Sequence, residues 1–259
     1  MCKALDPIFA KYISDNYVDD LIDYDQVKLV FLVESPHTQE VKNKIPLFGS
    51  SGSNLSAALN LGIFDFKGVT YGFGKWLSEQ HLLNQYKHIG IMNVSNIRLD
   101  NQLSNDEDLN KYINVLKFIK DSCTRTNAKY VKGNLTSVNI ITQLSNLTNS
   151  SKTKDKLEIY NLINDIKNNK DMYQQILNGL KIKFYYRLER IRNHDCCFVV
   201  LGNFANNFFY KFRGNTQHII TVHPSGKNLD NVDKEVQSRI HSALINAKCI
   251  NIKDFFELK

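Results

Sequence analysis

Short apolar runs that each stop at a polar residue or a glycine recur along the chain and predict buried strands. Val27–Val33 is an almost continuous run of β-branched and large apolar residues, and it stops at Glu34-Ser35-Pro36. Proline ends such a run because it has no N–H group to extend a strand ladder. Similar runs occupy residues 88–92, 197–201 and 218–222. Continuous apolar runs of this length are typical of strands that are buried on both faces of a parallel sheet.

Helical patterns separate these runs. Apolar spacing predicts helices over residues 54–61, 106–119 and 203–210, after a helical or turn-rich lead-in of about 25 residues. Alternating strands and helices predict an α/β fold around a mostly parallel, four-stranded sheet. From 131 to 192 the sequence becomes Asn- and Lys-rich and helical, and we interpret it as a basic insertion in a single domain spanning 1–259.

Composition narrows the class of protein. A chain of 259 residues that is 42% hydrophobic can bury one core, and it lies outside the range of disordered proteins. No apolar run approaches the roughly 20 residues of a membrane span, and no secretory signal is evident, so we expect a soluble, cytoplasmic protein. Five cysteines, with Cys196 and Cys197 adjacent, argue against a disulfide framework or a metal site. We expect no cofactor and no obligate protein partner.

The net charge of +7 favours a polyanionic partner. Much of it comes from residues 152–192, which carry ten Lys and Arg against five Asp and Glu. This stretch is either a DNA-backbone contact surface or an ordinary solvated helix face. Its candidate contacts are Lys181, Lys183, Arg187, Arg190 and Arg192. The neighbouring Tyr185 and Tyr186 either stack on bases or pack into the core.

Polar side chains follow three of the four predicted strands. They are the carboxylate of Glu34, the amide of Asn93 and the imidazole of His223. In open parallel sheets, ligands bind beyond the carboxyl ends of the strands, where the loops converge. We therefore expect these three side chains to meet in one cleft.

Five short blocks in this order resemble the motifs of the uracil-DNA glycosylase superfamily. The blocks are Leu32-Val33-Glu34-Ser35-Pro36, Pro46-Leu47-Phe48-Gly49-Ser50-Ser51-Gly52, Ile91-Met92-Asn93-Val94, Val200-Leu201-Gly202 and Val222-His223-Pro224-Ser225. The closest likeness is to the family 4 branch, whose first motif reads Gly-Glu-Ala-Pro-Gly and whose last reads His-Pro-Ser. The resemblance implies a three-layer α/β/α fold and a monofunctional DNA glycosylase. Such an enzyme flips out a damaged or modified pyrimidine and hydrolyses its N-glycosidic bond, which leaves an abasic site.

The resemblance also implies the roles of two catalytic residues. Glu34 matches the acidic group that orients the attacking water and faces the sugar as it becomes positively charged. His223 matches the residue that hydrogen-bonds to the base oxygen. Breaking the bond gives an oxocarbenium-like sugar and an anionic base, so the two residues stabilise opposite halves of one charge separation.

Five further residues are implied around the base. Asn93 matches the amide that reads the pyrimidine edge, and depending on its orientation it pairs with uracil or with cytosine. Phe48, or Leu47 beside it, supplies the stacking wall. Ser35 and His37 stand where the classical uracil enzymes have an aspartate and the tyrosine that crowds C5 of the base. This replacement opens room for a C5 substituent.

Contacts to the DNA backbone are implied at two places. Residues 49–53 form a short Gly/Ser loop entering a helix, which suits a phosphate. The implied DNA-binding residues are Ser51, Ser53, Ser225, Lys227, Asn228 and Leu229. In the second group Asn228 or Leu229 acts as the wedge that enters the minor groove.

Two departures from the family pattern refine the expectation. Ile97 stands at a cysteine position of the family 4 iron-sulfur cluster, and Cys2 has no partner three residues away, so we expect no cluster. Together with the altered C5 wall, this motivates a sharper hypothesis, an antiviral enzyme that excises a C5-modified cytosine or uracil of phage DNA, and the choice between DNA repair and antiviral defence stays open. Two alternatives remain open: a catalytically silent DNA-binding module, and a nucleoside hydrolase on the same fold.

Overall fold

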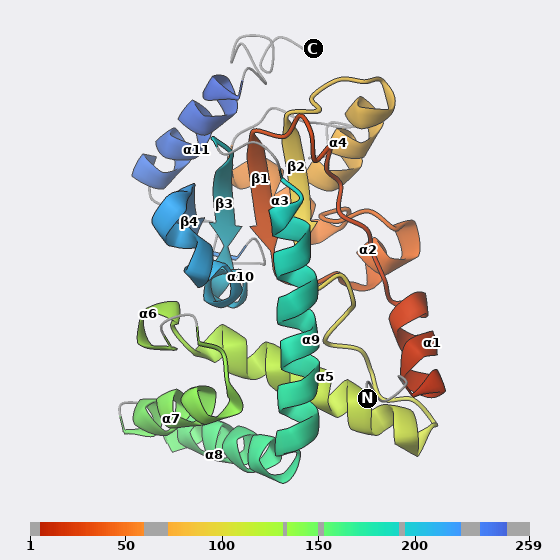
Figure 1. The fold of residues 1–259 in the computed structure, drawn as a ribbon, viewed down its shortest axis with the longest axis vertical. Helices are drawn as coiled ribbons and strands as arrows, with labels where there is room; N and C mark the ends of the chain where they lie inside the picture. The colour runs from red at the N-terminus through yellow and green to blue at the C-terminus, as the bar shows by residue number, and fades with distance from the viewer. Residues whose placement is uncertain are drawn as a thin grey trace.

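The computed structural model describes residues 6–59, 72–131, 134–149, 153–191, 195–223 and 234–247. Its strands form a four-stranded, entirely parallel sheet in the order β2-β1-β3-β4 (Figure 1). The strands are β1 (Leu29–Val33), β2 (Ile89–Asn93), β3 (Cys197–Leu201) and β4 (Gln217–Thr221). Each strand lies within two residues of a predicted apolar run, so the predicted parallel sheet is confirmed.

Both faces of the sheet are buried, because successive side chains of each strand point to opposite faces. In β1, Val30 and Leu32 belong to one buried cluster, whereas Leu29, Phe31 and Val33 belong to the other. All five side chains are at most 3% exposed. This two-sided burial explains why the strand sequences are continuous apolar runs.

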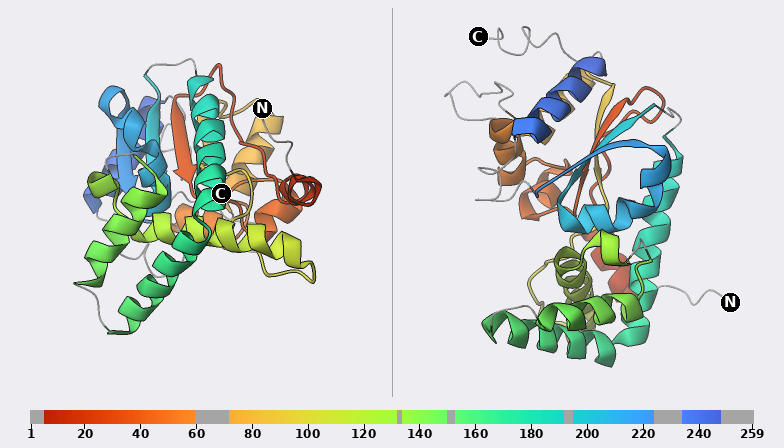
Figure 2. Two further views of the ribbon diagram at one scale, coloured as in Figure 1. Left: turned by 60° about the horizontal axis from the view of Figure 1, so that its bottom comes forward. Right: turned by 90° about the vertical axis from the view of Figure 1, so that its left-hand side faces the viewer.

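Helices cover the two faces and complete the predicted three-layer α/β/α fold (Figure 2). One face packs against α3 (Ser50–Ala58), α4 (Phe73–Leu82) and α11 (Lys234–Asn246). The other packs against α1 (Pro7–Asp15), α5 (Glu107–Arg125), α9 (Lys170–Glu189) and α10 (Gly202–Phe209). The remaining helices are α2 (Thr38–Asn43), α6 (Ala128–Val131), α7 (Ser137–Thr148), α8 (Thr153–Asn168) and the 3₁₀ helix η1 (Tyr210–Asn215). No helix in the described ranges combines the length and apolarity needed to cross a membrane.

The predicted helical insertion forms α7, α8 and α9. The first two lie beyond α5, away from the sheet, and α9 runs from them back along the sheet (Figure 1). Their buried residues Ile140, Ile159 and Tyr173 belong to the same cluster as Val30 of the sheet. These helices therefore extend the main core, and the limits of the insertion stay a prediction.

Candidate functional site

The carboxyl ends of the strands bring the predicted residues to one edge of the sheet. Glu34 directly follows β1, and Asn93 ends β2 in register with Val33. The loop beyond β2 stays beside β1, because the N–H group of Ser95 donates to the Glu34 carbonyl at 3.0 Å. His223 follows β4 by two residues and lies within electrostatic reach of the Glu34 carboxylate.

Asn93 is completely buried, yet its amide is unused. The side chain is 0% exposed, and neither Nδ2 nor Oδ1 has a hydrogen-bond partner in the described part of the chain. The hydroxyl of Ser35 is also buried, and it has no hydrogen-bond partner among the residues that the structure describes. Each unsatisfied group costs about 1–3 kcal/mol, and such groups in native proteins call for an explanation. A polar ligand at this edge would satisfy them.

A chain of charged groups begins at Glu34. Nζ of Lys120, on α5, lies 3.1 Å from Oε1 of Glu34 and 2.8 Å from Oδ2 of Asp100. Asp100 also accepts from Nε of Arg98 at 3.0 Å and lies 3.4 Å from Nδ1 of His37. Exposure rises along this chain, from 8% for the Glu34 side chain to 38% for that of His37, so it leads from the buried edge toward solvent.

The pKa shifts of Asp100, His37 and Lys120 favour the ionised forms of these three side chains. Burial alone would raise the pKa of Asp100, but His37, Lys120 and Arg98 outweigh it and lower that pKa well below its ordinary value. The hydrogen bond to Asp100 raises the pKa of His37. Burial opposes the charge of Lys120, but Glu34 and Asp100 raise its pKa above the ordinary value. The surroundings of Lys120 therefore favour its ammonium form beside Glu34.

The surroundings of His223 favour its neutral imidazole form. Burial lowers its pKa below the ordinary value, and the charge of Glu34 only partly opposes this shift. A neutral ring offers one N–H donor and one acceptor. Gly202, with φ +85°, lies against this residue, and a Cβ at position 202 would come 2.9 Å from the His223 Cβ. Glycine is therefore needed at position 202, where the chain leaves β3 beside His223.

The two candidates for the stacking wall have different environments. Leu47 is 2% exposed and packs in the core with Leu55 and Phe73. Phe48 is half-buried, and Nζ of Lys75 lies 6.0 Å from its ring centre. Leu47 has a left-handed backbone, with φ +54°, which turns the chain between the two residues. Phe48 is thus the better placed of the two to meet a ligand.

The segment that carries Phe48 is held by two tight contacts. The carbonyl of Leu47 would lie 1.8 Å from a Cβ at position 52, so only glycine permits α3 to pack there. The buried carboxylate of Glu40 accepts hydrogen bonds from the backbone N–H groups of Leu47 and His37, the second at 2.6 Å. Burial raises the pKa of Glu40, and both hydrogen bonds oppose that shift. Glu40 therefore links the segment that carries His37 to the segment that carries Phe48.

The Gly/Ser segment is not the predicted loop. Residues 50–53 form the first turn of α3, whose N-cap is Gly49, so the helix begins four residues before its predicted start. Ser51 is 9% exposed and Ser53 is half-buried. Ser225, Lys227, Asn228 and Leu229 lie outside the described residues. All of these DNA contacts stay predictions.

The interpretation of the basic stretch as a DNA contact surface is wrong for Arg187. Its guanidinium is buried, with Nη1 2.6 and 2.8 Å from the Asp20 carboxylate oxygens, and Nη2 donates to the Val94 carbonyl at 2.7 Å. Arg190 stacks over the Tyr24 ring at 4.0 Å. These arginines hold α9 against the N-terminal segment.

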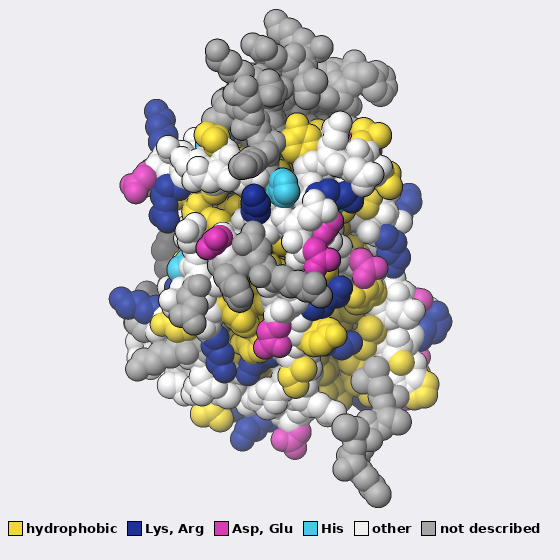
Figure 3. Space-filling view, turned by 45° about the horizontal axis from the view of Figure 1, so that its top comes forward, with side chains coloured by type: hydrophobic (Ala, Val, Ile, Leu, Met, Phe, Trp, Pro, Cys, Tyr) yellow, Lys and Arg dark blue, Asp and Glu magenta, His cyan; other side chains and the backbone are white. Residues whose placement is uncertain are grey.

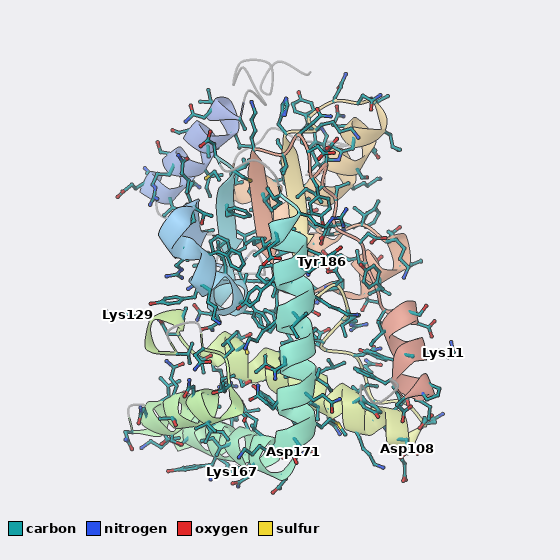
Figure 4. All side chains as sticks on the ribbon, viewed as in Figure 1. Lys11, Asp108, Lys129, Lys167, Asp171 and Tyr186 are labelled. Carbon is teal, nitrogen blue, oxygen red and sulfur yellow. The ribbon has the colours of Figure 1, made fainter. Side chains whose placement is uncertain are left out.

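Other members of the same stretch reach the surface. Lys183 is exposed, Tyr186 is 66% exposed on the side of α9 seen in Figure 4, and Tyr185 packs against the core. Lys181 donates to the Leu135 carbonyl at 3.2 Å. Arg192 lies outside the described residues. Figure 3 shows Lys and Arg side chains dispersed among acidic and hydrophobic ones on one face of the molecule, without a single continuous basic patch.

Sequence reasoning missed Lys120, Asp100 and Glu40. Lys120 lies one residue beyond the predicted end of its helix, and a lysine there is usually solvated. Asp100 lies seven residues after Asn93, in a loop without periodic pattern. Glu40 carried one available signal, because an acid three residues after an N-cap position is typical of a capping box.

Two hollows in the described surface lie away from the candidate site residues. A groove of about 770 Å³ lies between α11 and the amino-terminal ends of β3 and β4, and it includes Lys28, His218 and Arg239. Another hollow, of about 640 Å³, lies along α7. Ligands of open parallel sheets bind at the carboxyl ends of the strands, so neither hollow is the candidate site.

Comparison with known proteins does not assign a family. The chain matches no protein-family model and no curated protein. Across the described ranges, no three His, Cys, Asp or Glu side chains are grouped as metal ligands. The function is therefore inferred from the residues at the carboxyl edge of the sheet.

Proposed function

We propose that this protein is a monofunctional DNA glycosylase of the uracil-DNA glycosylase type. It flips a pyrimidine out of DNA and hydrolyses the N-glycosidic bond to leave an abasic site. The observation that carries the proposal is the buried amide of Asn93, which has no partner within the described ranges and lies at the same sheet edge as Glu34 and His223. An amide of this kind matches the hydrogen-bonding edge of a flipped base, which enzymes read inside a closed pocket.

Glu34 and His223 divide the charge of the transition state. The sugar becomes oxocarbenium-like as the bond breaks, and the Glu34 carboxylate stabilises it while orienting the attacking water. The departing base becomes an anion, and the N–H group of neutral His223 donates to its oxygen. One preorganised donor of this kind contributes about 3–4 kcal/mol.

Asn93, Ser35 and Phe48 bind the base in this proposal. The amide of Asn93 pairs with the pyrimidine edge, the free Ser35 hydroxyl supplies a further polar contact, and the half-buried Phe48 ring stacks on the base. Stacking replaces what the base loses on leaving the duplex. Each of these groups is unused or partly exposed in the described protein.

The proposed substrate is a pyrimidine with a C5 substituent, such as the hydroxymethylated or glucosylated cytosine of phage DNA. The half-exposed His37, with Asp100 and Arg98 behind it, gives the rim of the site hydrogen-bonding groups that uracil does not need. The proposed role is antiviral defence, with uracil repair as the alternative. The free thiols of Cys123, Cys196 and Cys197 fit a cytoplasmic setting.

Abasic-site formation tests this proposal. Purified protein is incubated with uracil-containing, unmodified, hydroxymethylated and glucosylated DNA, and alkali then cleaves the strands at abasic sites. We expect cleavage of one modified substrate, and we expect Glu34→Gln to abolish it. Cleavage of uracil DNA alone would assign repair and exclude the C5 hypothesis. DNA binding without cleavage would indicate a silent binding module, and turnover of free nucleosides without salt-sensitive DNA binding would indicate a nucleoside hydrolase.

A further inference from the structure

Lys120 bridges the catalytic carboxylate and a second carboxylate. Its side chain is 19% exposed, and its ammonium lies 3.1 Å from Glu34 and 2.8 Å from Asp100. A lysine buried to this degree retains its charge only when it is paired. Glu34 likewise has 8% side-chain exposure, and Lys120 is its ion-pair partner among the described residues.

The direction of Lys120 is fixed by the helix that carries it. The amide Nδ2 of Asn207, on α10, donates to the carbonyls of Cys123 and Thr126 at 2.7 and 3.0 Å, which anchors the last turn of α5. In the turn before, Ile119 is completely buried in the core. Lys120 is therefore presented to the strand ends by a rigid element and not by a loop.

Several other titratable groups lie within electrostatic reach of Glu34. Asp121 and Cys123 lie on α5, and both interact electrostatically with Glu34. His223 faces it from beyond β4, and His37 and Asp100 lie further along the charged chain. Among these neighbours, Lys120 supplies the ion pair with Glu34.

We propose that Lys120 is a positioning residue that holds the Glu34 carboxylate in one orientation beneath the sugar. The inference rests on the proposed function, because it assigns Lys120 a role in the same site. Lys120 also joins Glu34 to the Asp100–His37 pair, so the charge at the rim is linked to the charge at the reacting bond. Removing the ammonium leaves two buried carboxylates, Glu34 and Asp100, without the cation that lies between them.

The ammonium form of Lys120 cannot act as a nucleophile. An amine attacks a sugar carbon through its lone pair, and an ammonium has none. Two carboxylates accept hydrogen bonds from Lys120, and they raise its pKa against the opposing effect of burial. The protein should therefore hydrolyse the bond with water and form no Schiff base with the DNA.

Lys120→Met, Lys120→Arg and the exposed Lys117→Met on the same helix test the role. Single-turnover excision is measured against pH. We expect Lys120→Met to slow excision at least about 100-fold at neutral pH, as for loss of a preorganised electrostatic group, and to move the acid limb to higher pH. Lys120→Arg should restore much of the rate and the wild-type limb, and Lys117→Met should match wild type. A wild-type rate and pH profile in Lys120→Met would overturn the inference.

Crystal structures of wild type and Lys120→Met give a second readout that needs no activity. We expect the Glu34 side chain to have a different orientation in Lys120→Met, because the ion pair that holds it is gone. An unchanged Glu34 orientation overturns the inference even if the protein is a glycosylase. Absence of excision by wild type, with the Glu34 orientation changed in Lys120→Met, overturns the proposed function alone. Borohydride trapping of wild type on DNA, lost in Lys120→Met, would make Lys120 a nucleophile and also overturn the positioning role.

Discussion

Arg187 and Asp20 form a buried ion pair that joins α9 to the N-terminal segment. Nη1 of Arg187 lies 2.6 and 2.8 Å from the two Asp20 oxygens, and the two side chains are 10% and 4% exposed. Nη2 donates to the carbonyl of Val94, the residue after Asn93. The helical region between α5 and β3 is thereby connected to the strand end that carries the base-reading amide.

Arg187→Met should destabilise the protein by about 3–5 kcal/mol, because it leaves the Asp20 carboxylate buried without a cation. Urea unfolding measures the change. Lys183→Met is the matched control, since Lys183 is exposed on the same helix and should alter stability by less than about 0.5 kcal/mol. Equal effects of the two substitutions would show that the ion pair contributes nothing specific.

Asn93→Leu should stabilise the free protein while abolishing base excision. Leucine has the same number of side-chain heavy atoms and the same branching, and it removes two buried polar atoms that have no partner among the described residues, so the gain should be about 1–3 kcal/mol. Asn207→Leu is the matched control, because the equally buried Asn207 donates to two carbonyls and its loss should destabilise. Thermal unfolding compares the three proteins. Destabilisation by both substitutions would indicate that Asn93 is structural.

Gly202→Ala should disturb His223. The left-handed φ of +85° disfavours alanine by about 1–2 kcal/mol, and the new Cβ would push against the His223 Cβ. A small displacement of a catalytic group can reduce the rate by about 100-fold. Gly179→Ala, in open space on α9, should instead stabilise by about 0.5–1 kcal/mol. Excision assays with unfolding curves distinguish the two sites, and full activity in Gly202→Ala would contradict the placement of His223.

The His37–Asp100 pair should make stability depend on pH. Asp100 raises the pKa of His37 in the folded state, with Glu40 adding to the shift and Lys120 opposing it. The stabilisation is therefore complete below the unfolded value of about 6.5 and disappears as pH rises through the folded pKa. The difference in unfolding midpoint between wild type and His37→Gln should be larger at about pH 6 than at about pH 9. A difference that is constant over this range would exclude the ionised pair.

The residues at the strand ends could be predicted from the sequence. The apolar runs mark where each strand ends, and they are followed by Glu34, Asn93 and His223. The carboxyl ends of parallel strands lie at one edge of the sheet, and this does not depend on the loop conformations. The sequence predicts Asn93 from its position in the Ile91–Val94 block. That its amide lacks a hydrogen-bond partner among the described residues follows only from the positions of its neighbours in the fold.

Residues outside the strand ends could not be predicted in the same way. Lys120 reaches Glu34 because α5 crosses the strand ends, and helix direction depends on tertiary packing that periodicity does not encode. The choice between Leu47 and Phe48 depends on one left-handed backbone angle at Leu47. Arg187 has the composition of a DNA contact, but a distant aspartate makes it structural.

Release of a free base is the most direct test of the central claim. Wild type and Glu34→Gln are each incubated with glucosylated, hydroxymethylated and uracil-containing DNA, and the small molecules set free are identified by mass spectrometry. We expect wild type to release an intact pyrimidine base from one modified DNA, and Glu34→Gln to bind the same DNA but release none. Binding of these DNAs by folded wild-type protein without release of any base would contradict the proposed glycosylase activity.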